Sequence, residues 1–147
     1  MIFEKLENNR FDEFFELVTK MVAEAEFCEA VPEVGKIKKM FNMPNIAVFG
    51  AIEDDKLIGF ISGIYNEYFF SSKKRVSDLG FYVLPEYRGT RASIRLLKDL
   101  EKWALDLGSK DLCLGQTTAV NIEKTQKFYE RLGYKTVGFN TVKHLGI

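Results

Sequence analysis

The sequence predicts one α/β domain over all 147 residues, with a mixed, mostly antiparallel sheet of six or seven strands and about four helices on its two faces. Three observations lead to this fold class. Residues 46–53 and 57–70 are rich in apolar residues and are joined by a tight turn, which predicts an antiparallel hairpin. Residues 76–83, 91–107 and 112–114 follow as strand, helix and strand, which implies a right-handed crossover and a parallel central pair. Four segments repeat apolar residues at helical spacing.

The N-terminal part is predicted to form a short strand and two amphipathic helices. Residues 2–6 are the strand, and Asn8 or Asn9 offers an N-cap to the first helix. The apolar residues of that helix recur at steps of three and four: Phe11, Phe14, Phe15, Val18, Met21, Val22 and Ala25. The second helix is expected to begin near Pro32 and to end before Pro44.

An acidic stretch connects these two helices. Its members are Glu24, Glu26, Glu29 and Glu33. Such a stretch can attract a cationic acceptor amine, but a run of like charges more often marks a solvated connection.

The central strands carry their own turn signals. Asp54 and Asp55 are expected to form the hairpin turn, and Gly59 and Gly63 inside the second strand indicate a bulge or a close backbone approach. Gly108 is the expected left-handed cap that ends the helix over 91–107.

The C-terminal part is predicted to form a helix and the last strands. Residues 122–132 place apolar and aromatic side chains on one helical face, and Gly133 ends the helix. Residues 134–139 alternate as a strand does and can pair with residues 141–145.

The turn between the strand over 76–83 and the following helix is a candidate anion site. Pro85 cannot donate to a sheet ladder, so the strand stops there, and the helix then opens on backbone N–H groups without intrahelical partners. Arg88 and Arg91 flank this opening, and a helix N-terminus with positive charge nearby favours phosphate. The turn lacks the Gly-x-x-x-x-Gly-Lys-Ser/Thr pattern, which argues against a nucleoside triphosphate P-loop.

Composition excludes several classes of function. Lys and Arg together number 21, as do Asp and Glu, so the net charge gives no sign of nucleic acid or an anionic membrane as partner. No apolar run is long enough to span a bilayer, and acidic residues interrupt any N-terminal signal peptide, so a cytoplasmic location is expected. Cys28, Cys113 and the single His144 have no metal-ligand spacing, so no metal is expected.

Three stretches resemble the GNAT superfamily of acetyl-coenzyme A-dependent N-acetyltransferases. Residues 79–89 (Leu-Gly-Phe-Tyr-Val-Leu-Pro-Glu-Tyr-Arg-Gly) are similar to that family's fourth strand and pyrophosphate turn. Residues 128–134 (Phe-Tyr-Glu-Arg-Leu-Gly-Tyr) resemble its second motif, and residues 52–60 resemble its second hairpin. The three matches fall in family order over roughly the last two thirds of the chain.

The resemblance implies an acetyl-CoA site along the fourth strand and the turn after it. The backbone groups of Phe81 and Val83 are expected to bind pantetheine, and the pyrophosphate is expected on the N–H groups of the turn. Asn121 resembles the asparagine that begins the motif helix, and it is equally suited to be an N-cap. The expected cofactor-binding residues are Phe81, Val83, Arg88, Gly89, Thr90, Arg91, Ala92, Ser93 and Asn121.

The turn departs from the family pattern Arg/Gln-x-x-Gly-x-Gly/Ala. Arg91 stands where a glycine is usual, and Ser93 replaces the second small residue. The Cβ of Arg91 can crowd the pyrophosphate, while its guanidinium can add a bidentate phosphate contact. The sequence is therefore interpreted as a modified coenzyme A site.

The resemblance also implies the catalytic residues. Tyr129 matches the tyrosine that stands beside the coenzyme sulfur, where a phenol can donate a proton to the departing thiolate; its alternative role is core packing beside Phe128. Some relatives carry a glutamate base at the position of Ser77. Asp78 is the candidate base here, although strand alternation turns it to the opposite face of the sheet unless a bulge intervenes.

The expected activity is acetyl transfer from acetyl-CoA to a primary amine, on a small molecule or a protein, by direct attack in a ternary complex. Two alternatives remain open: a coenzyme A-binding regulator without catalysis, and an interaction module that keeps only the fold. A homodimer is also possible, because an aromatic cluster can form a dimer face, an acceptor slot or part of the core. Its members are Tyr65, Tyr68, Phe69 and Phe70.

Overall fold

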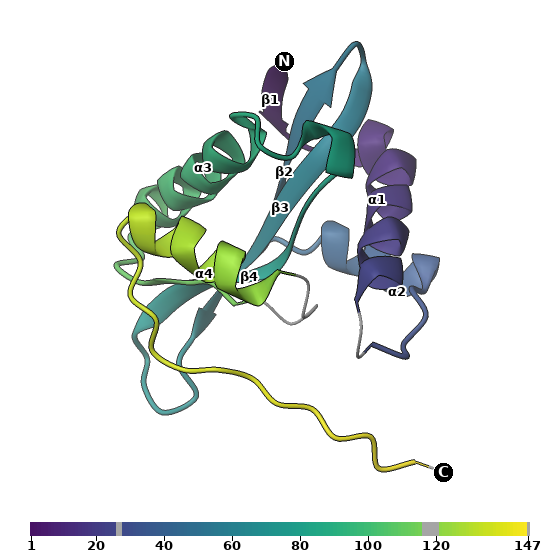
Figure 1. Cartoon of the computed structure of the whole chain (residues 1–147). Helices are drawn as coiled ribbons and strands as arrows, with labels where there is room; N and C mark the ends of the chain where they lie inside the picture. The colour runs from purple at the N-terminus through teal and green to yellow at the C-terminus, as the bar shows by residue number, and fades with distance from the viewer. Residues whose placement is uncertain (26–27, 116–120, 147) are drawn as a thin grey trace.

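The computed structural model describes residues 1–25, 28–115 and 121–146. Five strands, four α-helices and two 3₁₀ turns make up these residues (Figure 1). The strands are β1 (Ile2–Lys5), β2 (Ile46–Glu53), β3 (Lys56–Glu67), β4 (Lys74–Val83) and β5 (Leu112–Cys113). The helices are α1 (Phe11–Glu24), α2 (Val34–Phe41), α3 (Ala92–Asp106) and α4 (Ile122–Arg131), and the 3₁₀ turns are η1 (Asn8–Arg10) and η2 (Pro85–Tyr87).

The strands form one mixed sheet in the order β1-β2-β3-β4-β5. Strands β1 to β4 are antiparallel to their neighbours, whereas β5 runs parallel to β4. The predicted mixed sheet and its parallel pair are therefore confirmed, with α3 as the connection between the two parallel strands. Among the described strands, however, this pair lies at one edge of the sheet and not at its centre.

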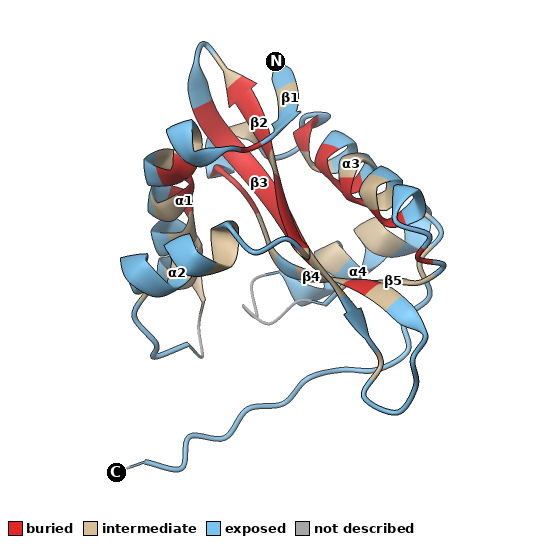
Figure 2. Cartoon of the chain, turned by 180° about the vertical axis from the view of Figure 1, so that it is seen from behind, coloured by how far each residue is buried: buried red, intermediate tan, exposed pale blue. Residues whose placement is uncertain are grey.

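Helices cover both faces of the sheet, with α1 and α2 on one side and α3 and α4 on the other (Figure 1). Buried residues run along β2 and β3 and along the inner side of α3 (Figure 2). On the α1 side, the rings of Phe14 and Phe60 meet edge to face with centroids 4.9 Å apart. On the α3 side, Leu96, Leu97 and Leu100 are fully buried, so the helical periodicity of the sequence matches the observed core.

The turn residues behave as their chemistry predicts. Asp54 and Asp55 join β2 to β3 with φ angles of 50° and 62°, as a two-residue hairpin turn requires. Gly108 and Gly133 have φ angles of 82° and 94° just beyond α3 and α4, where left-handed residues end helices.

The predicted C-terminal strands are wrong. Residues 134–146 form no strand, and the part of the sheet that the structure describes has five strands instead of six or seven. The chain leaves the domain in extended form after α4 (Figure 1). Alternation along one segment makes a strand only if that segment pairs with another, and in the described part of the chain residues 134–146 pair with neither edge of the sheet.

The predicted asparagine cap of the first helix is also wrong. Asn8 and Asn9 lie in η1, and α1 begins at Phe11 without a side-chain cap. The Asn8 side chain instead donates to Asn42 Oδ1 over 3.0 Å, which links η1 to the end of α2.

Gly63 on β3 shows how closely the sheet approaches α3. A Cβ built there would lie 2.6 Å from Leu100 Cδ1, 3.2 Å from Val76 Cγ1 and 3.3 Å from the carbonyl oxygen of Ser77. A β-bulge lies beside this glycine, and another lies between Ala51 and Ile52 where β3 carries Gly59, so the predicted bulge and close approach both occur.

The variants Gly63→Ala and Gly35→Ala add the same methyl group and are expected to change stability in opposite directions. At Gly63 the overpacked methyl is expected to lower the free energy of unfolding by about 1–3 kcal/mol. At Gly35, within α2, nothing lies within 4 Å of the new Cβ, so the better helix former is expected to add about 0.5–1 kcal/mol. Urea unfolding measures both values, and a Gly63→Ala protein as stable as the parent would contradict the close approach.

No helix among the residues seen in the structure is long and apolar enough to cross a membrane.

Candidate active site

A β-bulge in β4 sets the direction of Asp78. Strand β3 pairs Ser62 with Gly80 and Gly63 with Asp78, which leaves Leu79 as an extra residue on β4. The extra residue interrupts the alternation of side chains, so Asp78 and Gly80 face opposite sides of the sheet.

The faces are identified by the helices that the two glycines approach. A Cβ on Gly80 would lie 3.4 Å from the methyl group of Met21 on α1, whereas a Cβ on Gly63 points at Leu100 of α3. Paired residues of antiparallel strands share a face, so Asp78 lies on the side of α3 and α4. Ser77 pairs with Ile64, the neighbour of Gly63, so Asp78 still faces away from Ser77, as strand alternation predicts; the bulge instead separates Asp78 from the face of Gly80 and Tyr82.

Asp78 is half-buried near the end of β5. The backbone N–H of Gly115 donates to its Oδ1 over 3.1 Å. Burial raises the pKa of the Asp78 carboxyl to about 6, against the lowering effect of its backbone hydrogen bonds. A carboxyl with this pKa can gain and lose a proton near neutral pH.

Tyr129 lies on α4 and is electrostatically coupled to Asp78. Burial, followed by the charge of Asp78, raises the pKa of the Tyr129 phenol far above its usual value, so the phenol keeps its proton at neutral pH. Its ring packs 5.7 Å from that of Phe128 and 5.9 Å from that of Tyr134. The structure therefore brings the two predicted catalytic residues into one environment.

Tyr134 and Glu101 hold this aromatic group against α3. The Tyr134 hydroxyl donates to Glu101 Oε1 over 2.6 Å, and its backbone N–H donates to the carbonyl oxygen of Tyr129 over 3.0 Å. Reasoning from the sequence included Tyr134 only as part of a motif and did not identify Glu101. No local pattern pairs two residues 33 positions apart, so only the fold reveals this contact.

Most of the β4 edge that faces away from β3 has no partner strand among the described residues. Within them, β5 pairs with β4 only at Val76 and Ser77. The N–H of Leu84 donates to Ile58 on β3, and successive strand residues direct their amides to alternate edges. The amides of Phe81 and Val83 therefore face away from β3, in agreement with the expected pantetheine edge.

The turn after β4 is internally organised by Thr90. Its hydroxyl donates to the carbonyl oxygen of Tyr87 over 2.7 Å and accepts the N–H of Ala92 over 3.2 Å. The N–H of Thr90 also donates to Tyr87, over 3.4 Å. In this structure the amides of Thr90 and Ala92 are thus already used within the turn.

Three other amides of the turn make no hydrogen bond to the described part of the chain: those of Gly89, Arg91 and Ser93. Gly89 has a φ of 85°, a left-handed conformation that favours glycine. Arg91 is the N-cap of α3 with a φ of −70°, so no glycine is required at this position, and its side chain is exposed. Backbone N–H groups that lack a partner at a helix N-terminus are suited to bind an anion.

Arg88 is held by neighbouring protein groups. Its Nε donates to the carbonyl oxygen of Val83 over 2.8 Å, and its Nη2 donates to Glu24 at the end of α1 over 3.0 Å. The guanidinium also lies over the Tyr82 ring at 5.2 Å. Burial and the hydrogen bond with Glu24 raise the pKa of Tyr82 to about 12. Arg88 therefore joins α1 to the end of β4.

Asn121 directly precedes α4 and is the N-cap of this helix. It adopts a left-handed conformation with a φ of 51°, and its carbonyl oxygen accepts the N–H of Thr125 over 3.0 Å. Its side chain makes no capping hydrogen bond. The preceding connection, residues 116–120, lies outside the described residues.

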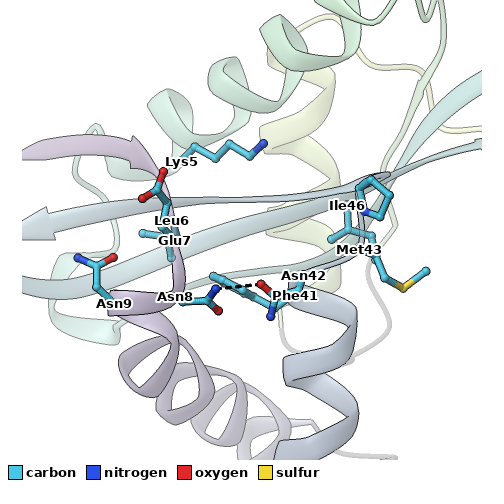
Figure 3. A pocket seen from close by; sticks show the side chains of 10 residues that line it. Lys5, Leu6, Glu7, Asn8, Asn9, Phe41, Asn42, Met43 and Ile46 are labelled. Atoms are coloured by element: carbon cyan, nitrogen blue, oxygen red, sulfur yellow. Dashed lines mark hydrogen bonds between the residues drawn. The ribbon is translucent and has the colours of Figure 1, made fainter.

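A surface depression of about 540 Å³ lies elsewhere. It is bordered by residues 5–9 at the end of β1 and by residues 41–44 and Ile46 between α2 and β2, where Asn8 and Asn42 are hydrogen-bonded (Figure 3). None of these residues belongs to the predicted site. Among the described residues, no group of His, Cys, Asp and Glu side chains could hold a metal ion.

The variant Asp78→Asn is expected to be more stable than the parent at pH 8 and to differ from it much less at pH 4. Because the folded-state pKa of Asp78 is raised from 3.8 to about 6, ionisation destabilises the folded state as the pH rises through this interval. The full effect is up to about 3 kcal/mol, at about 1.4 kcal/mol per pKa unit. An asparagine oxygen can still accept the Gly115 N–H. Urea unfolding at both pH values tests this, and an equal gain at pH 4 would contradict it.

Comparison with known proteins agrees with this geometry. The family model described as "Acetyltransferase (GNAT) family" matches residues 9–134. No curated protein sequence gives a significant match.

Three solved structures illustrate the similarity of fold. AAC(6')-Iy in complex with the bisubstrate analogue CoA-S-monomethyl-acetylneamine has a TM-score of 0.79 at 16% identity, with 99% of this chain and 98% of that one covered. Ribosomal-protein-alanine N-acetyltransferase from Brucella melitensis biovar Abortus 2308 gives 0.74 at 18% identity and 99% and 100% coverage. An acetyltransferase of Trypanosoma brucei gives 0.77 at 21% identity and 98% and 99% coverage.

The family match spans nearly the whole domain, from Asn9 in η1, two residues before α1, to Tyr134, the tyrosine that packs on Tyr129. It includes the bulged strand, the anion turn and α4. The chain belongs to the acetyltransferase (GNAT) family.

Proposed function

We propose that the chain transfers an acetyl group from acetyl-CoA to a primary amine, which attacks the thioester directly in a ternary complex. The observation that supports this most strongly is the grouping of Asp78 and Tyr129 beside the outward-facing amides of β4. Family membership supports acetyl-CoA as the co-substrate.

The coenzyme would lie along the open edge of β4 and end on the turn. Pantetheine would bond to the amides of Phe81 and Val83, and one of these N–H groups would stabilise the developing oxyanion. The diphosphate would lie on the amides of Gly89, Arg91 and Ser93, with further charge from the arginines of the turn. Thr90 and Ala92 would shape the turn, and Asn121 would start α4 beside the site.

The proton transfers would use Asp78 and Tyr129. As the amine nitrogen bonds to the acetyl carbon, its acidity rises and Asp78 accepts its proton. When the carbon–sulfur bond breaks, the Tyr129 phenol donates a proton to the departing thiolate and is then reprotonated from solvent. The Tyr129 phenol is protonated before the reaction, as this role requires, and its raised pKa makes it a weaker acid than an ordinary tyrosine.

The acceptor class follows from the modest strength of the base. An α-amino group, with a pKa of about 8, has a useful neutral fraction at pH 7, whereas a lysine side chain at about 10.4 needs more help. We infer an easily deprotonated amine, on a small molecule or a protein. Proteins of similar fold include enzymes named for aminoglycosides and for ribosomal-protein alanine.

Two measurements test the proposal. Calorimetry with coenzyme A is expected to detect binding, and a thiol-release assay over a panel of primary amines is expected to detect turnover. Binding without turnover on any amine would favour the alternative, a coenzyme A-binding regulator. Absence of binding would favour an interaction module and overturn the proposal. The variant Arg91→Gly, which restores the usual glycine, shows whether Arg91 helps or hinders the coenzyme.

A further inference from the structure

Helix α4 carries Tyr129 and packs less tightly than α3. All residues of α4 lie within the described part of the chain, and none of them is fully buried. Its aromatic residues Phe128 and Tyr129 pack against the core but are only partly buried. Helix α3, in contrast, buries Leu97 and Leu100 completely. Because buried apolar surface is the main force that holds a helix on a sheet, α3 has a fixed position and α4 depends on additional contacts.

The C-terminus of α4 ties Tyr134 to Tyr129. Gly133 is left-handed with a φ of 94°, and its N–H donates to the carbonyl oxygen of Glu130 over 3.1 Å. The N–H of Tyr134 donates to the carbonyl oxygen of Tyr129 over 3.0 Å. These two bonds form a Schellman motif, which usually brings the outer side chains of the two bonded residues together. Here the Tyr129 and Tyr134 rings lie 5.9 Å apart, so a displacement of Tyr134 would also displace Tyr129.

The Tyr134 hydroxyl connects this unit to α3, which lies on the same side of the sheet as α4 (Figure 1). It donates to Glu101 Oε1 over 2.6 Å, a short hydrogen bond of the charge-assisted kind. Glu101 directly follows the fully buried Leu100, so its backbone is firmly placed. Ser93, whose amide belongs to the proposed diphosphate site, lies roughly 12 Å before Glu101 along the same helix.

We propose that Glu101 is a positioning residue for acetyl transfer: through the Tyr134 hydroxyl, it sets where the Tyr129 phenol stands relative to the open edge of β4. This inference rests on the proposed function, in which that phenol protonates the departing thiolate. Glu101 acts through Tyr134 and not on the reacting atoms. One rigid helix, α3, would then hold the coenzyme diphosphate at its start and the acid through Glu101, so that the thioester and its acid are placed by the same element.

The first test compares two substitutions of Glu101 in the thiol-release assay. Glu101→Leu removes the acceptor and is expected to lower kcat by about 10-fold, since misplacing a reacting group by about 1 Å costs up to about 10²-fold. Glu101→Gln keeps an oxygen that can accept the Tyr134 hydroxyl and is expected to retain most of the parental kcat. The control Asp106→Leu removes an exposed carboxylate from the same helix and is expected to match the parent. A Glu101→Leu enzyme with parental kcat would overturn the inference.

The Tyr129→Phe background separates positioning of the acid from a general loss of packing. In that background Glu101→Leu is expected to cause no further loss of kcat, because the group that Glu101 positions is already gone. Affinity for coenzyme A, measured by calorimetry, is expected to be unchanged by Glu101→Leu in both backgrounds. A further loss of kcat in the double variant, as large as in the single one, would show that Glu101 does not act through Tyr129.

Fluorine NMR tests the positioning without any turnover. When the six tyrosines are replaced by fluorotyrosine, the Tyr129 resonance is identified by its absence from Tyr129→Phe. Glu101→Leu is expected to shift this resonance, whereas Glu101→Gln and Asp106→Leu are expected to leave it in place. An unshifted Tyr129 resonance in Glu101→Leu would refute the inference even if the parent acetylates amines. The expected shift in a protein that acetylates no amine would refute the proposed function and still support the placement of Tyr129 by Glu101.

Discussion

Replacing Tyr129 with phenylalanine is expected to lower kcat by about 10²-fold while leaving the affinity for coenzyme A nearly unchanged. The reason is that the variant keeps the ring that packs on Phe128 and Tyr134 but loses the only proton that this side chain can donate. General acid catalysis typically contributes factors of 10²–10⁴. Steady-state thiol release measures kcat, and calorimetry measures coenzyme affinity.

The matched control is Tyr68→Phe. It also removes one tyrosine hydroxyl, but the Tyr68 hydroxyl donates to Asp111 Oδ2 over 2.6 Å, whereas the charge that acts on the Tyr129 hydroxyl is that of Asp78. Its kcat is expected to equal that of the parent. If the Tyr129→Phe enzyme also turns over at the parental rate, Tyr129 is a packing residue and the leaving thiolate obtains its proton elsewhere. A loss of coenzyme binding in Tyr129→Phe would instead assign the hydroxyl to the coenzyme site.

The conformation of the turn after β4 could be predicted from the sequence because its signals are local. Pro85 ends the strand, Gly89 supplies a left-handed residue, and Arg91 begins a helix whose first amides lack partners. Each of these effects acts over a few residues. The use of the Thr90 hydroxyl within the turn was not predicted, because a threonine side chain has several local acceptors and donors to choose from.

The orientation of Asp78 could not be predicted for a different reason. A period of two along β4 would place Asp78 on the same face as Gly80, and only the pairing of Gly63 with Asp78 reveals the extra residue at Leu79 that puts them on opposite faces. Register between two strands depends on both of them, so no reading of one strand contains it. The contact between Tyr134 and Glu101 was missed for the same kind of reason.

Introducing a carboxylate at Ser93 is expected to weaken coenzyme A binding by about 10²-fold and to stabilise the protein at the same time. Ser93 is the second residue of α3, where an aspartate interacts favourably with the helix dipole and adds about 0.3–1 kcal/mol. The same charge would lie next to the coenzyme diphosphate. Two unit charges about 4 Å apart repel by about 1–4 kcal/mol, depending on how well water screens them.

Gly35→Asp provides the matched control, because Gly35 is the second residue of α2 and has open space at its Cβ. Both variants are expected to raise the unfolding midpoint, but only Ser93→Asp is expected to reduce coenzyme affinity in calorimetry. Added salt should reduce the difference in coenzyme A affinity between Ser93→Asp and the parent, since it screens exposed charges. If Ser93→Asp binds coenzyme A as the parent does, the diphosphate does not lie on the first turn of α3. Because the variant would be at least as stable as the parent, a loss of coenzyme binding could not be attributed to misfolding.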